Sequence, residues 1–220
     1  MKPSLVIIFV LFLVGCTTET ITKENNTIKE GTNQEGTPTL EENSDIEIAT
    51  FAGGCFWCTE SDFEHVPGVI QVISGYTGGE LEDPTYKEVS AGGTGHVEAV
   101  QVYYNPNLVS YQQLLDAYWR MINPTDIGGQ FVDRGYQYTS AIFYHNKEQK
   151  QLAETSKQKI QESGKYDQPI ATRIEPFQIF YKAEEYHQDY YKKNPIKYKY
   201  YRGGSGRDAY LEEAWGEKNE

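Results

Sequence analysis

The sequence predicts an α+β fold, a two-layer sandwich in which helices pack on a mixed sheet, in a single domain. Three observations predict this class. The 220-residue chain is only 38% hydrophobic, which excludes a multi-span membrane protein, and its 14% aromatic content is too high for a disordered chain. About 175 residues follow a polar N-terminal part, which is enough for one core. The predicted strands and helices alternate without regular βαβ repetition.

The N-terminal residues have the pattern of an export signal. Lys2 precedes a short apolar run over residues 5–14, about half of the ~20 residues that a membrane-spanning helix needs. The run ends in Leu13-Val14-Gly15-Cys16, which resembles the bacterial lipoprotein cleavage box, in which the Cys becomes the lipidated first residue. The alternative is an ordinary cleaved signal with a chance Cys. We expect residues 1–15 to be a lipoprotein signal peptide, and the protein to be anchored by Cys16 to a bacterial membrane, outside the cytoplasm.

Residues 16–46 are predicted to be a disordered tether. From Thr17 to Asp45 there is no aromatic residue, and seven acidic side chains against Lys23 and Lys29 give a net charge of −5. Such a segment cannot bury enough apolar surface to fold. The remaining domain is expected to span residues 47–220.

The first half of the domain is predicted as three strands and three helices. EIATFA at 47–52 reads as a strand that ends at two glycines, and 55–64 as a helix stopped before Pro67. Residues 69–76 form the second strand, 85–90 a short helix, and 96–104 the third strand, ended by Asn105-Pro106. Ser110 with Gln113 is a capping box that opens a helix to Met121, with apolar residues at helical spacing.

The second half begins with a long Gly-rich loop over 123–137. A strand follows at 140–144, and Asn146 with Gln149 opens a polar helix over 146–163. Residues 170–175 and 177–181 are predicted as short strands. Residues 184–192 are predicted as a helix and 211–215 as a helical turn.

The main chemical candidate is Cys55-Phe56-Trp57-Cys58, placed where a strand becomes a helix. Free N–H groups and the positive end of the helix dipole at a first turn are expected to lower the pKa of a cysteine there. Cysteines three residues apart lie on one helix face, so the second can resolve the first by forming a disulfide. Alternatives are zinc ligation, which usually needs two further ligands, a static disulfide, or a thioredoxin-like oxidoreductase.

Several multi-residue blocks give the chain a family resemblance. They are GGCFWCTE at 53–60, SGYTGG at 74–79, PTY at 84–86, TGHVEAV at 94–100, NPTD at 123–126, DRGYQYTS at 133–140 and AEEYHQ at 183–188. Together they resemble the A-type peptide methionine sulfoxide reductases over about residues 47–216, in order and with family-like spacing. The resemblance implies a two-layer α+β sandwich that reduces methionine S-sulfoxide, free or in proteins, to methionine without a metal or organic cofactor.

The resemblance also implies roles for the cysteines. Cys55 aligns with the nucleophile, which becomes a sulfenic acid as methionine leaves. A second thiol then forms a disulfide, which a thioredoxin-type donor reduces. Many relatives place that second Cys near the C-terminus, whereas the tail at 202–206 here has none. Once Cys16 is lipidated, Cys58 is the sole thiol left to resolve Cys55.

Other site residues are carried over by position. Glu98 aligns with the acid that protonates the sulfoxide oxygen. On a strand it shares a face with Val100 and Val102, and burial of that face would keep it protonated; alone, it would read as a solvated edge glutamate. The remaining residues are the oxygen-binding tyrosines Tyr86 and Tyr138, the apolar methyl pocket of Phe56 and Trp57, and the supporting positions Asp133, His187 and Tyr190.

The overall charge limits the partners. A net charge of −12 disfavours binding to nucleic acid. The expected partners are therefore oxidised methionine, a thioredoxin-like reductant and, through Cys16, a membrane. We expect a monomer that repairs oxidised exported proteins. A thioredoxin-type oxidoreductase and a non-enzymatic surface lipoprotein remain as alternatives.

Overall fold

The computed structural model describes residues 46–216. The predicted signal peptide, Cys16 and the predicted tether up to residue 45 lie outside the described residues. Within residues 46–216, no helix is both long enough and apolar enough to span a membrane.

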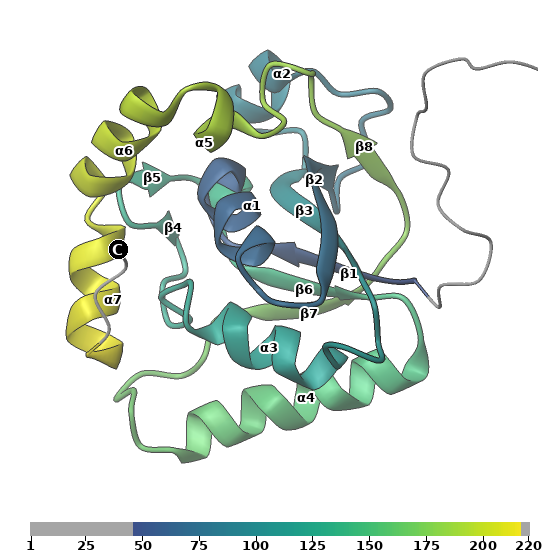
Figure 1. Ribbon diagram of the computed structural model, residues 1–220, viewed down its shortest axis with the longest axis vertical. Helices are drawn as coiled ribbons and strands as arrows, with labels where there is room; N and C mark the ends of the chain where they lie inside the picture. Colours follow the sequence, from purple (N-terminus) through teal and green to yellow (C-terminus); the bar gives the residue numbers. More distant parts are fainter. Residues whose placement is uncertain (1–45, 217–220) are drawn as a thin grey trace, which may run out of the picture. The chain divides into compact units, whose positions relative to one another are not determined.

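A six-stranded mixed sheet forms the centre of the domain, with strand order β7-β6-β1-β3-β2-β8 (Figure 1). All neighbouring strands are antiparallel except β6 and β7, which are parallel. The strands are β1 (Glu47–Ala52), β2 (Val69–Thr77), β3 (Val97–Tyr104), β6 (Ala141–Tyr144), β7 (Arg173–Pro176) and β8 (Phe180–Lys182). Because helices cover this sheet, the predicted α+β class is confirmed.

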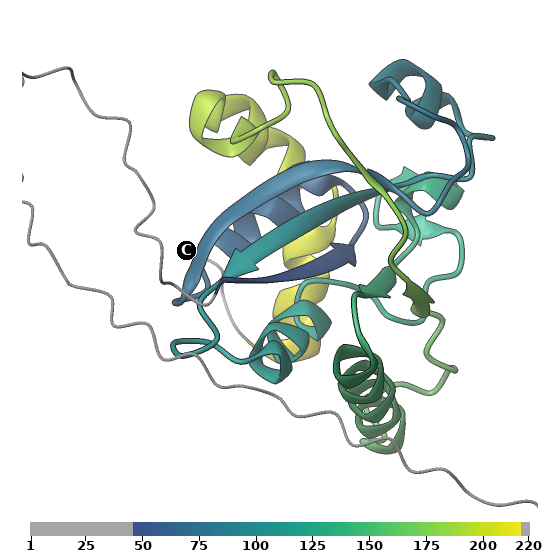
Figure 2. The same ribbon diagram turned by 90° about the vertical axis from the view of Figure 1, so that its right-hand side faces the viewer.

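Three helices build the larger core on one face of the sheet (Figures 1 and 2). They are α1 (Phe56–Glu64), α3 (Tyr111–Trp119) and α4 (Lys147–Glu162). The capping box predicted at Ser110 begins α3, and Asn146 caps α4. The strands contribute Phe51, Val100 and Val102 to this core, all fully buried. A smaller apolar cluster, with Ala52, Val97, Ala99, Ala141 and Phe143, lies on the other face.

Strand register places the predicted acid on the helix-covered face. Val100 of β3 pairs with Phe51 of β1, and Glu98, two residues earlier, pairs with Tyr76 of β2. Side chains two apart on a strand share a face, so Glu98 lies under the helices with the core. The expectation that this glutamate is buried is confirmed, and the solvated alternative is wrong.

The remaining elements are shorter strands and turns and the helices that follow β8, together with α2. They are α2 (Tyr86–Ala91), β4 (Gly129–Gln130), β5 (Asp133–Arg134), a 3-10 turn η1 (Tyr136–Tyr138), α5 (Tyr190–Lys193), α6 (Pro195–Gly204) and α7 (Arg207–Trp215). The predicted loop 123–137 therefore contains a two-stranded ribbon. The strands predicted at 170–175 and 177–181 lie later in the chain, at 173–176 and 180–182.

The helix predicted over 184–192 is wrong for most of its length. Residues 185–189 form turns, and α5 begins only at Tyr190. Asp189 has a left-handed backbone, with φ 52°, which an α-helix does not accommodate. The predicted turn at 211–215 is the end of a longer helix, α7, and α6 was not predicted.

We expect Gly75→Ala to destabilise the sheet. A Cβ at Gly75 would lie 2.3 Å from the carbonyl oxygen of Tyr181 and 2.4 Å from the ring of Phe180, so β8 would have to move away from β2. Overpacking of this kind costs about 1–3 kcal/mol, which urea unfolding would measure. Gly203→Ala is the control, because a Cβ there meets nothing within 4 Å. Equal stabilities of the two variants would contradict the expectation.

Candidate active site

The two glycines after β1 present Cys55 at the start of α1. Gly54 has φ 83°, and a Cβ there would lie 2.6 Å from the Cβ of Gln130. A side chain would be both strained and blocked, so only glycine fits this turn. Cys55 is the N-cap residue of α1, and its carbonyl oxygen accepts the backbone N–H of Cys58 at 3.1 Å.

A small pocket of about 60 Å³ opens beside Cys55. Its walls come from five separate parts of the chain, and they bring together most of the residues singled out in the sequence. The lining residues are Cys55, Phe56, Trp57, Tyr86, Glu98, Asp133, Tyr138 and Tyr201. The pocket therefore places a thiol, a carboxyl group, tyrosine hydroxyls and aromatic rings around one site. Among residues 46–216, no group of three or more His, Cys, Asp and Glu side chains is arranged to hold a metal ion.

Glu98 is a buried acid that stays protonated at neutral pH. Only 2% of it is exposed. Burial raises the pKa of its carboxyl group to about 8, even though the backbone N–H of Phe56 donates to Oε2 at 3.0 Å. The cost of desolvating the carboxylate therefore outweighs the hydrogen bond that would stabilise it. A neutral carboxyl group beside a thiol can donate a proton to a bound oxygen.

Tyr86 and Tyr138 bring their hydroxyl groups to the same pocket from different elements. Tyr86 is the first residue of α2, and its backbone N–H donates to Glu184 Oε1 at 2.8 Å. Tyr138 ends the 3-10 turn η1. Burial raises the pKa of Tyr86 to about 12 and also raises the pKa of Tyr138. Both hydroxyl groups therefore remain hydrogen-bond donors at neutral pH.

The two cysteines are reduced and buried, with Cys55 6% and Cys58 1% exposed. Burial raises the pKa of Cys55, and its contact with Cys58 raises it further. The hydrogen bond from Cys55 lowers the pKa of Cys58, and Arg207 and Arg202 lower it as well. The prediction that the helix start lowers the pKa of Cys55 is therefore wrong for the reduced protein. The first N–H of α1 donates to Glu98, and burial outweighs the helix field.

His187 and Tyr190, which the resemblance gives as supporting positions, do not line the pocket themselves. Both residues contact the side chain of Trp57, which does line the pocket. The indole Nε1 of Trp57 donates to His187 Nδ1 at 3.0 Å, and Tyr190 stacks on Trp57 with ring centroids 3.8 Å apart. These contacts fix the orientation of the Trp57 indole, which forms an apolar part of the pocket wall that suits a methyl group.

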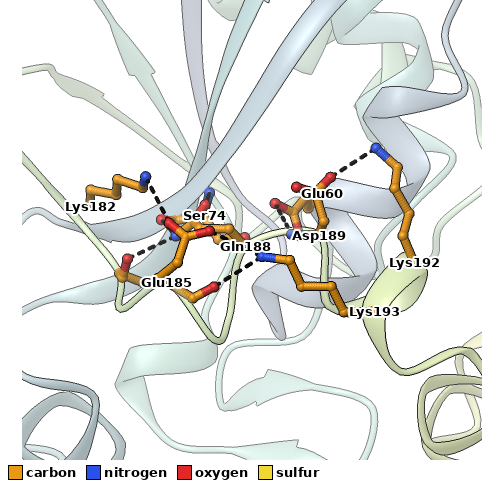
Figure 3. Close-up of polar contacts among 9 residues, drawn as sticks. Glu60, Ser74, Lys182, Glu185, Gln188, Asp189, Lys192 and Lys193 are labelled. Carbon is orange, nitrogen blue, oxygen red and sulfur yellow. Dashed lines mark hydrogen bonds and ion pairs between the residues drawn. The ribbon is translucent and has the colours of Figure 1, made fainter.

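A strap, residues 183–189, includes His187 and is held to β2 and α1 by Gln188 and Asp189 (Figure 3). The side chain of Gln188 forms two hydrogen bonds with the backbone of Ser74 in β2. Its Oε1 accepts the N–H of Ser74 at 3.0 Å, and its Nε2 donates to the carbonyl oxygen of Ser74 at 2.9 Å. The backbone N–H of Asp189 donates to buried Glu60 of α1 at 3.1 Å. Lys182 and Lys193 both pair with exposed Glu185. These bonds explain why the strap is held in turns rather than in the predicted helix.

Tyr201 of α6 is a pocket residue that the sequence reading missed. Its hydroxyl donates to Asp133 Oδ2 and lowers the pKa of Cys55, and its ring meets the edge of Trp57. With 18 tyrosines in the chain, no local signal separates Tyr201 from its neighbours. It sits on a helix that the periodicity did not predict.

We expect Tyr201→Phe to raise the pKa of Cys55 further, because the Tyr201 hydroxyl lowers it. Loss of one such hydrogen bond would reduce the thiolate fraction about threefold to tenfold at a given pH. The rate of alkylation against pH in a Cys58→Ser background would measure this change. The control is Tyr200→Phe, since the neighbouring tyrosine is 86% exposed. Identical alkylation profiles for the two variants would refute the contact.

Comparisons with known proteins cover the part of the chain that forms this pocket. Residues 47–219 match the family described as peptide methionine sulfoxide reductase. The chain belongs to the peptide methionine sulfoxide reductase family. The MsrA enzyme of Bacillus licheniformis is 56% identical over 174 residues, covering 79% of this chain and 96% of that protein. The MsrA enzyme of Bacillus subtilis is 56% identical over 172 residues, covering 78% and 97%.

Solved structures agree with this assignment. Reduced Mxr1 of Saccharomyces cerevisiae superimposes with a TM-score of 0.65 at 35% identity, covering 69% of this chain and 87% of that one. Methionine sulfoxide reductase A of Corynebacterium diphtheriae gives 0.63 at 33% identity, covering 72% and 79%. The predicted MsrA-type family is confirmed. This peptide methionine sulfoxide reductase is an oxidoreductase that reduces methionine sulfoxide by thiol chemistry.

Proposed function

We propose that this reductase acts on the S epimer of methionine sulfoxide, free or in exported proteins, with Cys55 as nucleophile and Cys58 as resolving thiol. The observation that carries the proposal is the placement of Cys55, protonated Glu98 and the tyrosines around one pocket of about 60 Å³. That volume fits the end of one side chain, and the rest of a polypeptide would lie outside.

In the first step, Cys55 Sγ attacks the sulfoxide sulfur while Glu98 gives its proton to the sulfoxide oxygen. Tyr86 and Tyr138 donate hydrogen bonds to that oxygen as its charge grows. The oxygen moves to Cys55 Sγ and methionine leaves. The proton that Cys55 loses returns to Glu98, so Cys55 ends as a sulfenic acid and the sulfoxide sulfur is reduced by two electrons.

In the second step, Cys58 Sγ attacks Cys55 Sγ. The S–S bond forms, the S–O bond breaks, and the hydroxyl group leaves as water. A thioredoxin-type dithiol then reduces the disulfide by exchange, so no metal or organic cofactor enters the cycle.

The direct test is dithiothreitol-driven conversion of a peptide carrying methionine sulfoxide. We expect turnover of the S epimer, with no turnover of the R epimer and none by Cys55→Ser. Turnover no faster than that of Cys55→Ser would reject the proposal.

The proposal for location rests on residues 1–16 of the sequence. A lipidated Cys16 would place the enzyme outside the cytoplasm, on a bacterial membrane, where exported proteins are oxidised. The full chain expressed in a bacterium should then require detergent for extraction, and Cys16→Ser should be released without it. Detergent-free recovery of the signal-processed full chain would reject the anchor.

A further inference from the structure

Arg207, the first residue of α7, is a buried cation beside the cysteine turn. It is 1% exposed. One guanidinium nitrogen, Nη2, donates to the carbonyl oxygen of Gly53 at 2.7 Å, and Nη1 donates to the carbonyl oxygen of Met121. Within residues 46–216 no acidic side chain forms an ion pair with Arg207. Burying an unpaired charge is unfavourable, so its placement calls for a function.

The surroundings of Arg207 fix the position of its charge. The ring of Phe131 lies 4.6 Å from the guanidinium carbon, and Phe131 itself has φ 56°, a strained conformation for a bulky residue. The hydroxyl of Ser205 accepts the backbone N–H of Arg207 at 3.2 Å. A Cβ on Gly54 would lie 3.1 Å from Nη2. The guanidinium therefore packs directly against the Gly53-Gly54 turn that leads into Cys55.

Arg202, the other arginine near Cys58, is compensated. Its guanidinium pairs with Asp62 at 2.6 Å and with Asp208 at 2.7 Å. Several groups from α1, β3, α6 and α7 face Cys58: Cys55, Asp62, Glu98, Tyr198, Tyr201, Arg202 and Arg207. Glu98 is neutral at pH 7, and Asp62 is paired with Arg202. Arg207 forms no ion pair within residues 46–216, although its charge also lowers the pKa of Asp133 in the neighbouring β5.

We propose that Arg207 is a positioning residue for the resolving step: its buried guanidinium locks the turn before the cysteines and stabilises negative charge on Cys58 Sγ as Cys58 attacks Cys55. This inference rests on the proposed role of Cys58. The thiolate is the attacking form in disulfide chemistry. Cys58 thiolate donates the electron pair of the new S–S bond, Cys58 is oxidised, and the sulfenic sulfur of Cys55 is reduced. The departing hydroxide takes a proton and leaves as water.

The test titrates Cys58 alone, in a Cys55→Ser background that keeps a hydrogen-bond donor at position 55. Thiolate absorbance and alkylation rate are followed against pH with Arg207 intact, with Arg207→Lys and with Arg207→Gln. Lysine keeps the charge, whereas glutamine keeps a donor without it. We expect the midpoint of the Gln variant to lie about one pH unit or more above that of the Lys variant, a tenfold difference in thiolate. Arg134→Gln, which removes an exposed arginine paired with Asp126, controls for net charge and should not move the midpoint.

A second readout uses the enzyme with both cysteines. The ratio of the rate of disulfide formation to the rate of methionine release should be about tenfold lower in Arg207→Gln than in Arg207→Lys at pH 7. Equal midpoints in the Lys and Gln variants would overturn the inference. If neither variant folds, the parent Cys55→Ser decides: a Cys58 midpoint at or above the ordinary thiol value of about 8.5 would also overturn it. The titration needs no reductase activity, so its failure is distinct from failure of the proposed function.

Discussion

Cys58→Ser should release one equivalent of methionine per enzyme and then stop when a thioredoxin-type protein is the reductant. Cys55 is still present to take the oxygen, but the described part of the chain then holds no second thiol to form the disulfide that a thioredoxin reduces. We expect steady-state turnover with that reductant to fall by about two orders of magnitude or more. A rapid-quench measurement of methionine, followed by steady-state assay, separates the burst from the cycle.

The choice of reductant sharpens this experiment. Dithiothreitol is small enough to attack the Cys55 sulfenic acid directly, so part of the turnover should return when it replaces the protein reductant. The matched control is Cys16→Ser, which removes the third cysteine of the chain and should cycle like the parent with either reductant. Full thioredoxin-driven turnover by Cys58→Ser would show that Cys58 is not needed for resolution.

Much of the fold follows from local sequence signals. The first strand, the cysteine helix and β3 were predicted within about two residues, because glycines or Asn-Pro bound them and apolar residues repeat at the right period. The segment after β8 was predicted badly because its contacts are distant in sequence. Gln188 bonds to Ser74 and Asp189 bonds to Glu60, and no local pattern reports either bond. Helix α6 begins with Pro195 at its first turn, a start signal that a search for apolar spacing overlooks.

The site residues also separate into those that local sequence blocks predicted and those that were missed. The blocks around Cys55, Tyr86, Glu98 and Tyr138 were found from the sequence, and the structure brings all four to one pocket. Tyr201 and Arg207 were missed because they lie on α6 and α7, the helices that were missed or shortened. The direction of the Cys55 pKa was also wrong, since burial and the neighbouring thiol can be read only in three dimensions.

Glu98→Gln should slow the first chemical step about 10²–10⁴-fold, the usual loss when a positioned acid is removed. The amide keeps the shape and can still bond to the pocket, but it cannot give a proton to the sulfoxide oxygen. In the parent enzyme the rate of methionine release should fall as pH rises through about 8, because that is where Glu98 loses its proton. Single-turnover rates between pH 6 and 10 would show this inflection, and Glu98→Gln should lack it. An unchanged single-turnover rate would remove Glu98 as the acid.

The ionisation of Glu98 should also make the free energy of unfolding depend on pH. Folding raises its pKa from the unfolded value of about 4.3 to about 8, so the folded protein binds the extra proton between these two pH values. The stability that the neutral Glu98 carboxyl group contributes is therefore fully present below about pH 4.3. It is lost progressively as pH rises from that value through about 8. Glu98→Gln removes this penalty, so the parent should lose on the order of a few kcal/mol relative to the variant between pH 5 and pH 9. Urea unfolding of both proteins at several pH values measures the difference. Glu148→Gln, at an exposed position in the first turn of α4, should track the parent, and parallel curves for Glu98→Gln as well would mean that Glu98 ionises in the folded protein as freely as in the unfolded chain.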